Sequence, residues 1–381
     1  MAPKGRLFAA FAGDAMLRES GRLPHAILFP FLFAGYQVYL DASLPRRLAA
    51  FYGCEESSLP DPAARLLSRE SVMLTSSPPD DPRDFLYVYD EPDPTAHRLP
   101  WRKRVRVGFD LFAPHRIRAP IIAPYPVHSA QAEWLQSPRL ERLRGEPRRV
   151  RVLFAGDSKG YVRNRVRYPA PKLPRLAVLN SVRRGISEDV IEVSGAQDIA
   201  ALCAERYVDR VVLSDSGTGI PPSEWMPNIA RADFFLCAPG IVMPMCHNLI
   251  EAMAVGTIPI LNYPEWMDPD LTHLRDCLVF EGEDDLVAKV RLALAMPSRQ
   301  IADMRANVVR YYEANLRPDV LVGAVEAREE RDITVLLHTE LNTARNAAKL
   351  NRNSVVITGP KSDSVLRRIV KAIDGVFAGP R

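Results

Sequence analysis

The stretch that decides the fold is PNIARADFFLCAPGIVMPMCHNLIEAMAVGTIPILNY, residues 227–263. Within it, the apolar run 234–237 has the length and composition of a buried strand. The segment 248–255 predicts a helix that ends at Gly256, because glycine is typical of the position just after a helix. Residues 257–261 predict a second buried strand, so the stretch is expected to form one strand–helix–strand unit of a parallel sheet.

One acidic residue, Glu251, lies near the start of this predicted helix. Ligands of parallel α/β sheets bind at the carboxyl ends of strands, often at helix N-termini. A carboxylate in that place can accept hydrogen bonds from both hydroxyls of a ribose or of another sugar. The alternative interpretation is an ordinary crossover whose glutamate only caps its helix.

Strand and helix patterns alternate along the rest of the chain, which predicts a parallel α/β protein in two halves. The helices expected besides the one in the opening stretch are 23–34, 44–53, 223–232, 284–296, 297–315, 339–350 and 364–377. The strands expected in the first half are 6–11, 36–41, 84–89, 105–109 and 121–123. Those expected elsewhere are 149–155, 208–213, 277–280, 333–337 and 354–358.

A polar, arginine-rich segment, 136–147, separates the two halves and predicts the domain linker. We therefore expect one Rossmann-like domain over 1–145 and a second over 146–315. Residues 316–381 are expected to form an extension, which either packs back on the first domain or makes an added subdomain.

Composition is typical of a globular chain: of 381 residues, 47% are hydrophobic and 25% are charged. No apolar run approaches the ~20 residues of a membrane helix. Asp14, Arg18 and Glu19 fall where a signal peptide would have its apolar core, so a cytoplasmic protein is expected. The five cysteines form no CxxC pair and the seven histidines lack metal-ligand spacing, which predicts reduced thiols and no bound metal.

The phrase EAMAVGTIP, residues 251–259, resembles the donor-binding motif of glycosyltransferases with the two-domain GT-B fold. The resemblance implies two Rossmann-like domains that face each other across a cleft. It gives Glu251 the role of holding the ribose of a nucleotide sugar, and it places His247 and Asn248 where they can reach a phosphate or the donor sugar. Many retaining members carry a second glutamate eight residues earlier, where this chain has Met243. The layout is closer to exostosin-like or fucosyltransferase-like members.

Three basic residues, Lys159, Arg163 and Arg165, follow the predicted strand 149–155 and a glycine turn. This order resembles the start of the nucleotide-binding domain in exostosin-like transferases, where basic residues contact the donor diphosphate. Guanidinium groups pair with phosphate oxygens and offset the charge of a leaving diphosphate. The alternative is a solvated basic face. Nucleic acid is not an expected partner, because the arginine run 139–167 lacks interleaved aromatic residues and a known motif.

Inverting GT-B enzymes usually take their general base from a loop at the carboxyl edge of the first domain's sheet. Asp14 follows the first predicted strand, Glu91 follows the strand 84–89 together with Asp90, and His128 lies in a proline-rich loop. A carboxylate or imidazole there can accept a proton from an acceptor hydroxyl. For each of these residues the alternative is a helix cap.

The resemblance thus implies sugar transfer from a nucleotide-sugar donor to a hydroxyl of a glycan, glycolipid or other acceptor. Inversion is expected, with no cofactor and no metal, and with peripheral membrane contact through basic residues. Two alternatives remain open. One is a nucleotide-sugar epimerase of the same fold, and the other is a non-catalytic protein that binds a glycan or a phosphate.

Overall fold

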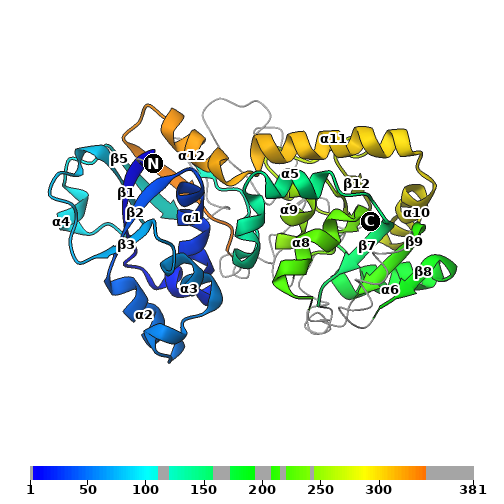
Figure 1. Cartoon of the computed structure of the whole chain (residues 1–381), viewed down its shortest axis with the longest axis horizontal. Coiled ribbons are helices and arrows are strands. Elements are labelled where there is room, and N and C mark those ends of the chain that lie inside the picture. Colours follow the sequence, from blue (N-terminus) through cyan, green and yellow to red (C-terminus); the bar gives the residue numbers. More distant parts are fainter. Residues whose placement is uncertain are drawn as a thin grey trace, which may run out of the picture. The chain divides into compact units, whose positions relative to one another are not determined.

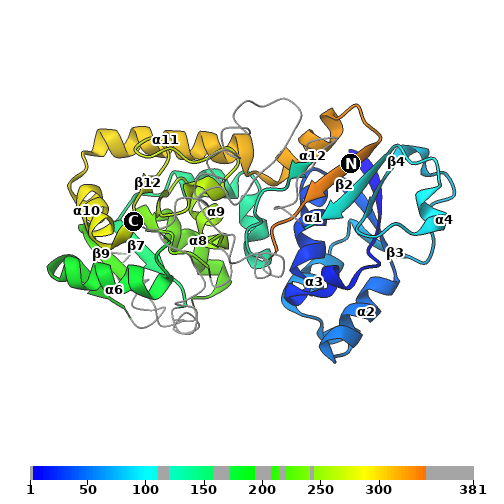
Figure 2. The same ribbon diagram turned by 180° about the vertical axis from the view of Figure 1, so that it is seen from behind.

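The computed structural model describes residues 3–109, 120–157, 172–193, 207–214, 220–240 and 244–339. The chain divides into two compact units, each with its own sheet (Figures 1 and 2). The first unit holds the described residues up to Ala130 and again from Arg317, and the second runs from Gln131 to Leu316. The predicted boundary lay at 145/146. Residues 340–381, the remainder of the predicted extension, lie outside the described residues.

The first unit is built on a seven-stranded sheet in which every paired strand is parallel to its neighbour. In spatial order its strands are β3 (Val72–Thr75), β2 (Tyr36–Asp41), β1 (Gly5–Ala10), β4 (Phe85–Tyr89), β5 (Lys103–Gly108), β13 (Asp332–Leu336) and β6 (Ile121–Ile122). The chain runs outward from β1 to β3 and then returns to the other side of β1 at β4. The pair β1/β4 is therefore a topological switch point, where open α/β sheets bind ligands.

Residues from beyond the second unit complete this first sheet. Strand β13 pairs with β5 on one side and with β6 on the other. The helix before it, α12 (Pro318–Ala327), packs against α1 (Arg22–Phe33). The other α-helices in the described part of this unit are α2 (Ser43–Tyr52), α3 (Asp61–Leu67) and α4 (Pro94–His97).

Two apolar clusters cover the two faces of the first sheet. On one face, Leu7, Val38 and Leu86 pack against Ile27 of α1. On the other, the rings of Phe8 and Trp101 stack at 5.6 Å and Tyr87 stacks on the same indole at 4.9 Å. Alternate residues of each strand face opposite sides, so a central strand of this sheet is apolar throughout.

The second unit has a six-stranded sheet, also parallel in every pair. In spatial order its strands are β12 (Leu278–Val279), β11 (Ile258–Leu261), β10 (Ala232–Leu236), β7 (Val150–Ala155), β9 (Tyr207–Ser214) and β8 (Val190–Glu192). Here β7 and β10 form the switch point, because the chain leaves β7 toward β8 and β9 and returns on the opposite side. The predicted α/β class with two Rossmann-like sheets is confirmed.

Six α-helices are described in this unit. They are α5 (Arg139–Arg144), α6 (Arg175–Gly185), α8 (Pro222–Ala230), α9 (His247–Ala254), α10 (Gly282–Ala295) and α11 (Ser298–Asn315). Helix α5 lies in the segment that was expected to be a linker. The many arginines of this segment made it resemble a polar linker in the sequence, although Leu140 and Leu143 are both buried.

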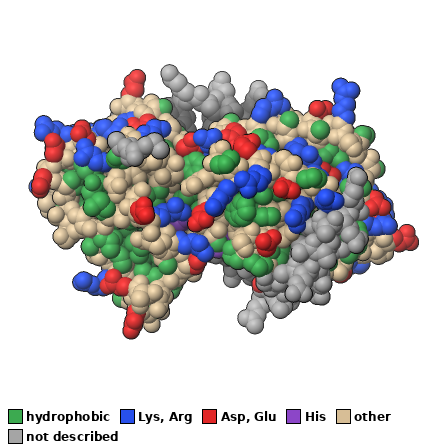
Figure 3. Space-filling model, in the orientation of Figure 1, with side chains coloured by type: hydrophobic (Ala, Val, Ile, Leu, Met, Phe, Trp, Pro, Cys, Tyr) green, Lys and Arg blue, Asp and Glu red, His purple; other side chains and the backbone are tan. Residues whose placement is uncertain are grey.

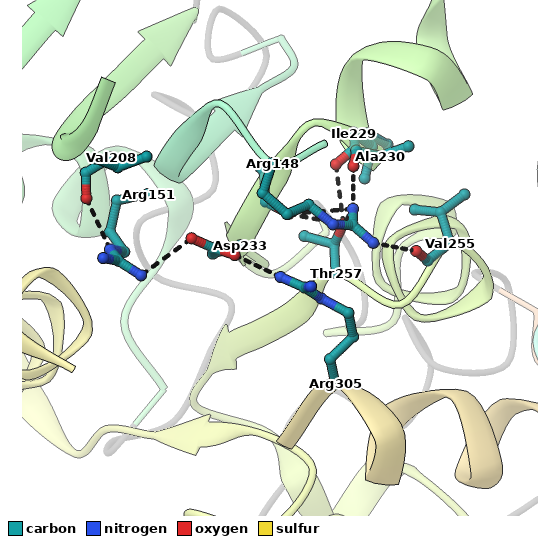
Figure 4. A network of polar contacts seen from close by, with 10 residues as sticks. Arg148, Arg151, Val208, Ile229, Ala230, Asp233, Val255, Thr257 and Arg305 are labelled. Atoms are coloured by element: carbon teal, nitrogen blue, oxygen red, sulfur yellow. Dashed lines mark hydrogen bonds and ion pairs between the residues drawn. The ribbon is translucent and has the colours of Figure 1, made fainter. Parts of the chain in front are cut away.

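A network of polar contacts lies at the amino-terminal edge of this sheet (Figure 4). Arg148 donates hydrogen bonds to the main-chain oxygens of Ala230 and Val255, at the ends of α8 and α9, and to the Thr257 hydroxyl. Beside it, Asp233 forms ion pairs with Arg151 and Arg305. The guanidinium of Arg148 thus satisfies helix-terminal carbonyls that have no partner within their own helices.

One face of the molecule carries mixed charge. On the face drawn in Figure 3, Lys and Arg side chains are interspersed with Asp and Glu side chains. Mixed charge is typical of an ordinary solvated surface, whereas a nucleic-acid interface is usually a continuous basic stripe. Among the helices of the described ranges, none combines the length and the apolar character that crossing a membrane requires.

Candidate functional site

The switch point of the second sheet is bridged by a side chain from the opening stretch of sequence. Asn248, in the first turn of α9, donates a hydrogen bond of 3.3 Å from its Nδ2 to the main-chain oxygen of Ala155, the last residue of β7. Gly156 follows with φ of +153°, a conformation that L side chains rarely adopt. The glycine lets the chain turn away at the N-terminus of α9, whose first-turn main-chain N–H groups point toward this edge.

Glu251 lies one helical turn further along α9. Only 1% of the residue is exposed, and the indole Nε1 of Trp225 donates a 2.6 Å hydrogen bond to its carboxylate. Trp225 belongs to α8 and is half-buried, with its ring edge-on to Phe235 of β10 at a centroid distance of 6.5 Å. A buried carboxylate needs such donors, since an ionised group without them is costly to bury.

Arg175 adds a positive charge to this edge. It is the first residue of α6 and is only 3% exposed. Its guanidinium donates to the main-chain oxygen of Asp157 at 2.7 Å and contacts the Cys246 sulfur at 3.7 Å. It therefore lies between the end of β7 and the start of α9, where a helix N-terminus already favours anions. Arg175 was not predicted from the sequence, because arginine is abundant throughout the chain.

A buried ion pair lies at the carboxyl end of β11. Lys172, just before α6, pairs with Glu265 and also donates a 2.6 Å hydrogen bond to the main-chain oxygen of Asn262. The segment that leads into α6 is thus held on one side by Asn262 and on the other by Asp157. These contacts join the ends of β7 and β11 into one carboxyl-edge region.

Of the residues predicted for donor binding, three are brought together here. His247, Asn248 and Glu251 all lie on the first five residues of α9, with His247 half-buried. The other predicted residues, Lys159, Arg163 and Arg165, lie outside the described residues, as does Met243. Trp225, Arg175 and Lys172 were not predicted.

The carboxyl edge of the first sheet is organised by Asp90. Its buried carboxylate accepts hydrogen bonds from the main-chain N–H groups of Ala12 and Gly13, each at 2.9 Å, and of Glu91 at 2.7 Å. Burial raises the pKa of Asp90, and these N–H donors act in the opposite direction. Asp90 thereby ties the loop after β1 to the end of β4, which is a structural role.

The two predicted acids of this edge lie on that same loop pair. Asp14 begins a short 3-10 helix, and its side chain is 81% exposed, 3.3 Å from the Arg47 guanidinium. Glu91 is also exposed. A Cβ on Gly13 would lie 2.8 Å from the Glu91 carboxylate, so that carboxylate rests against the residue preceding Asp14. Both acids therefore reach solvent at the β1/β4 switch point.

His128 lies elsewhere on the first unit, in the loop after β6. Strand β6 is three positions from β4 in the sheet, about 14 Å at ~4.8 Å per strand. The main-chain N–H of Ala130 donates to His128 Nδ1 at 3.2 Å. Desolvation lowers the pKa of His128, and the nearby Asp61 carboxylate opposes that effect while Arg65 adds to it. His128 thus follows the edge strand β6, whereas Asp14 and Glu91 follow the neighbouring strands β1 and β4.

A polar cluster that sequence reasoning missed lies at the carboxyl end of β13. Glu19 pairs with Arg22, and Arg22 donates a 2.7 Å hydrogen bond to the Tyr125 hydroxyl. Thr339 also donates to Glu19, and the buried His338 ring lies edge-on to Tyr125 at 5.9 Å. Glu19 has a positive φ of 57°. A non-glycine residue in this region is strained, and such strain is found more often near functional sites.

The described part of the chain has two free cysteines in its core, Cys237 and Cys277. No group of three or more His, Cys, Asp or Glu side chains there is arranged to hold a metal ion. Cys237 and Cys277 are buried, and burial raises the pKa of both thiols well above the ordinary value. Such thiols are poor nucleophiles, because the thiolate is the reactive form.

Comparison with solved structures finds a glycosyltransferase from Rickettsia africae ESF-5, at 9% sequence identity and a TM-score of 0.42, covering 86% of this chain and 98% of that chain. It also finds HepE from Anabaena in complex with UDP, at 12% identity and a TM-score of 0.42, covering 85% and 99%. A third is a variant of the Thermobaculum terrenum O-GlcNAc transferase, at 12% identity and a TM-score of 0.40, covering 91% and 69%. No protein-family model matches the sequence, and the search of curated proteins finds no relative.

Proposed function

We propose that this protein is a glycosyltransferase that moves a sugar from a nucleotide-activated donor to a hydroxyl of its acceptor. One observation carries the proposal. Glu251, the acid of the phrase that resembles the GT-B donor motif, is buried at the carboxyl edge of a parallel sheet. It lies beside the topological switch point, and the Trp225 indole orients its carboxylate. Open α/β sheets bind their ligands at such a switch point, so this place suits an acid that holds a ribose.

In the proposed donor complex, Glu251 accepts hydrogen bonds from the two ribose hydroxyls. A carboxylate has about four acceptor sites, so it can keep the indole bond and still receive both hydroxyl protons. Bonds to a charged acceptor are stronger than bonds between neutral groups. Replacement of Glu251 should therefore weaken binding of the nucleotide itself, whichever sugar it carries.

The donor diphosphate would lie at the N-terminus of α9. The first turn of the helix directs its main-chain N–H groups and the positive end of its dipole there. Arg175 supplies a fixed guanidinium beside them, and Lys159, Arg163 and Arg165 remain predicted contributors. These groups would stabilise the charge that develops on the leaving diphosphate without a bound metal.

The acceptor hydroxyl needs a base. We assign this role to Asp14 or Glu91, which are solvent-exposed acids at the switch point of the first sheet. The carboxylate takes the hydroxyl proton, the oxygen attacks the anomeric carbon, and the bond to the diphosphate breaks. A single displacement of this kind inverts the anomeric centre. His128 fits less well, because its Nδ1 accepts a main-chain hydrogen bond and a neutral ring then carries its proton on Nε2.

The donor site is tested by thermal unfolding of the purified protein with UDP, GDP, CMP, dTDP and their sugars. A ligand that binds only the folded state raises the unfolding temperature by mass action. One nucleotide should raise it in the wild type and in the control Glu188→Ala, whose side chain is exposed. The effect should be absent in Glu251→Ala. If no nucleotide raises it in the wild type, the proposal is wrong.

The chemistry is tested by the acceptor-side variants Asp14→Asn and Glu91→Gln. The variant that lacks the base should keep the thermal shift with nucleotide and lose turnover by a factor of about 10²–10⁴. Nucleotide binding by the wild type without transfer to any glycan or glycolipid acceptor would favour the non-catalytic alternative. Conversion of the donor sugar without an acceptor would favour the epimerase.

A further inference from the structure

Asn262 presents a feature that the proposed donor site leaves unexplained. It follows directly on β11, and the residue is only 6% exposed. Neither its Nδ2 nor its Oδ1 has a hydrogen-bond partner. Native proteins pair nearly all buried polar groups, because burying an amide without partners is unfavourable. The carboxamide of Asn262 therefore has both a donor and an acceptor that the protein itself does not use.

The main chain at Asn262 is firmly held, in contrast to its side chain. Lys172 donates a 2.6 Å hydrogen bond to the Asn262 main-chain oxygen and forms an ion pair with Glu265. Both charged side chains of that pair are less than one-tenth exposed. The main chain that carries the carboxamide is thus fixed by a buried ion pair before any ligand arrives, and a fixed support favours a precise contact.

Asn262 also lies on the same sheet edge as the donor residues. The segment that leads into α6 contacts Asn262 through Lys172, and it contacts Asp157 at the end of β7 through Arg175. Strand β11 is two positions from β7, about 10 Å at ~4.8 Å per strand. A donor whose diphosphate binds at the N-terminus of α9 would therefore place its nucleoside or its sugar within reach of Asn262.

We propose that Asn262 is a specificity-determining contact for the donor, which rests on the function proposed above. Its Nδ2 donates to the donor molecule and its Oδ1 accepts from it, so the group it recognises must do both. Two parts of a nucleotide sugar have this chemistry, namely the hydroxyls of the sugar and the imide or amide edge of the base.

The test uses Asn262→Leu, which keeps the side-chain size and removes both polar atoms. Because the orphaned amide is gone, the ligand-free variant should unfold at the same temperature as the wild type or higher. Its affinity for the nucleotide sugar, measured by calorimetry, should fall about 10- to 100-fold, as loss of one or two hydrogen bonds implies. The control Asn315→Leu removes a bonded amide, whose Nδ2 donates to the Tyr311 carbonyl. It should unfold earlier and bind the donor normally.

The bare nucleoside diphosphate distinguishes the two sources of the contact. An equal loss of affinity for nucleotide and nucleotide sugar identifies the base, and a loss confined to the nucleotide sugar identifies the transferred sugar. Wild-type donor affinity in Asn262→Leu, together with earlier unfolding, would show that the amide has only a structural role and would overturn the inference alone. Absence of donor binding in the wild type would overturn the proposed function and this inference together.

Discussion

The indole Nε1 of Trp225 donates a hydrogen bond of 2.6 Å to a carboxylate oxygen of Glu251. The two residues are 26 positions apart in the chain and belong to helices on either side of β10 in the sequence. Through this bond, the only polar atom of the indole ring is paired with a buried carboxylate. It also selects one orientation of the carboxylate, so less ordering remains to be done when a ligand binds.

Trp225→Phe should therefore weaken nucleotide binding even though it keeps an aromatic ring. The loss of one hydrogen bond to a charged group is worth about 1.5–3 kcal/mol, or roughly a 10- to 150-fold loss in affinity. Isothermal calorimetry with the nucleotide identified by thermal unfolding measures the change.

A double-mutant cycle with Glu251→Gln shows whether the two residues act together. We expect a coupling energy of about 0.5–3 kcal/mol, as is found for residues in direct contact. Strictly additive losses in the double variant would mean that the indole bond does not prepare the carboxylate for its ligand.

Arg148 should stabilise the second unit through its bonds to the ends of α8 and α9 (Figure 4). Arg148→Met keeps the apolar stem and leaves helix-terminal carbonyls without their donor. We expect the free energy of unfolding to fall by about 2–4 kcal/mol, as measured by urea denaturation. Arg142→Met, at an exposed position of α5, should change it by less than about 0.5 kcal/mol. Equal effects of the two substitutions would contradict this role.

His25 should make the first unit sensitive to acid. The residue is 2% exposed, and burial, followed by the charges of Arg69 and His128, lowers the pKa of His25 from 6.5 to about 3. The folded state therefore resists a proton that the unfolded chain accepts. Its contribution to stability is complete above pH 6.5 and is lost toward pH 3, at up to about 1.4 kcal/mol per pH unit.

Urea unfolding of His25→Gln between about pH 7.5 and about pH 4.5 covers the upper part of this titration and checks the expectation. The free energy of unfolding of the variant should change less steeply with pH, by a slope that corresponds to about one proton. Part of the slope should persist, because burial also lowers the pKa of His338 to about 4. Parallel curves for variant and wild type would rule out His25 as a source of the acid sensitivity.

Glu326 should stabilise the packing of α12 against the amino-terminal edge of the first sheet. Its carboxylate accepts hydrogen bonds from the Tyr36 hydroxyl at 2.5 Å and from both terminal nitrogens of Arg102, at 2.7 and 2.6 Å. Because this group is partly exposed, we expect Glu326→Gln to lower the free energy of unfolding by about 1–3 kcal/mol. Thermal unfolding measures the loss, and the exposed Glu329→Gln serves as its control.

Local sequence was sufficient where a strand is a clean apolar or alternating run. Strand β2 spans Tyr36–Asp41 as predicted, and β1 differs from its prediction by one residue at each end. The sequence did not reveal β3, because an edge strand buries little and its residues Met73 and Leu74 remain half-exposed. Helix α3 was missed for a similar reason, since seven residues are too few to show a helical period.

The sequence by itself determined the two parallel sheets and the group His247, Asn248 and Glu251, because residues one to four apart on one helix have neighbours fixed by the helical repeat. Only the tertiary structure decided that Trp225, Arg175 and Asn262 lie at the same sheet edge. Their proximity depends on which strands become neighbours, with β10 beside β7 and β11 beside β10. That order is set by packing of the whole unit, and no local spacing in the chain encodes it.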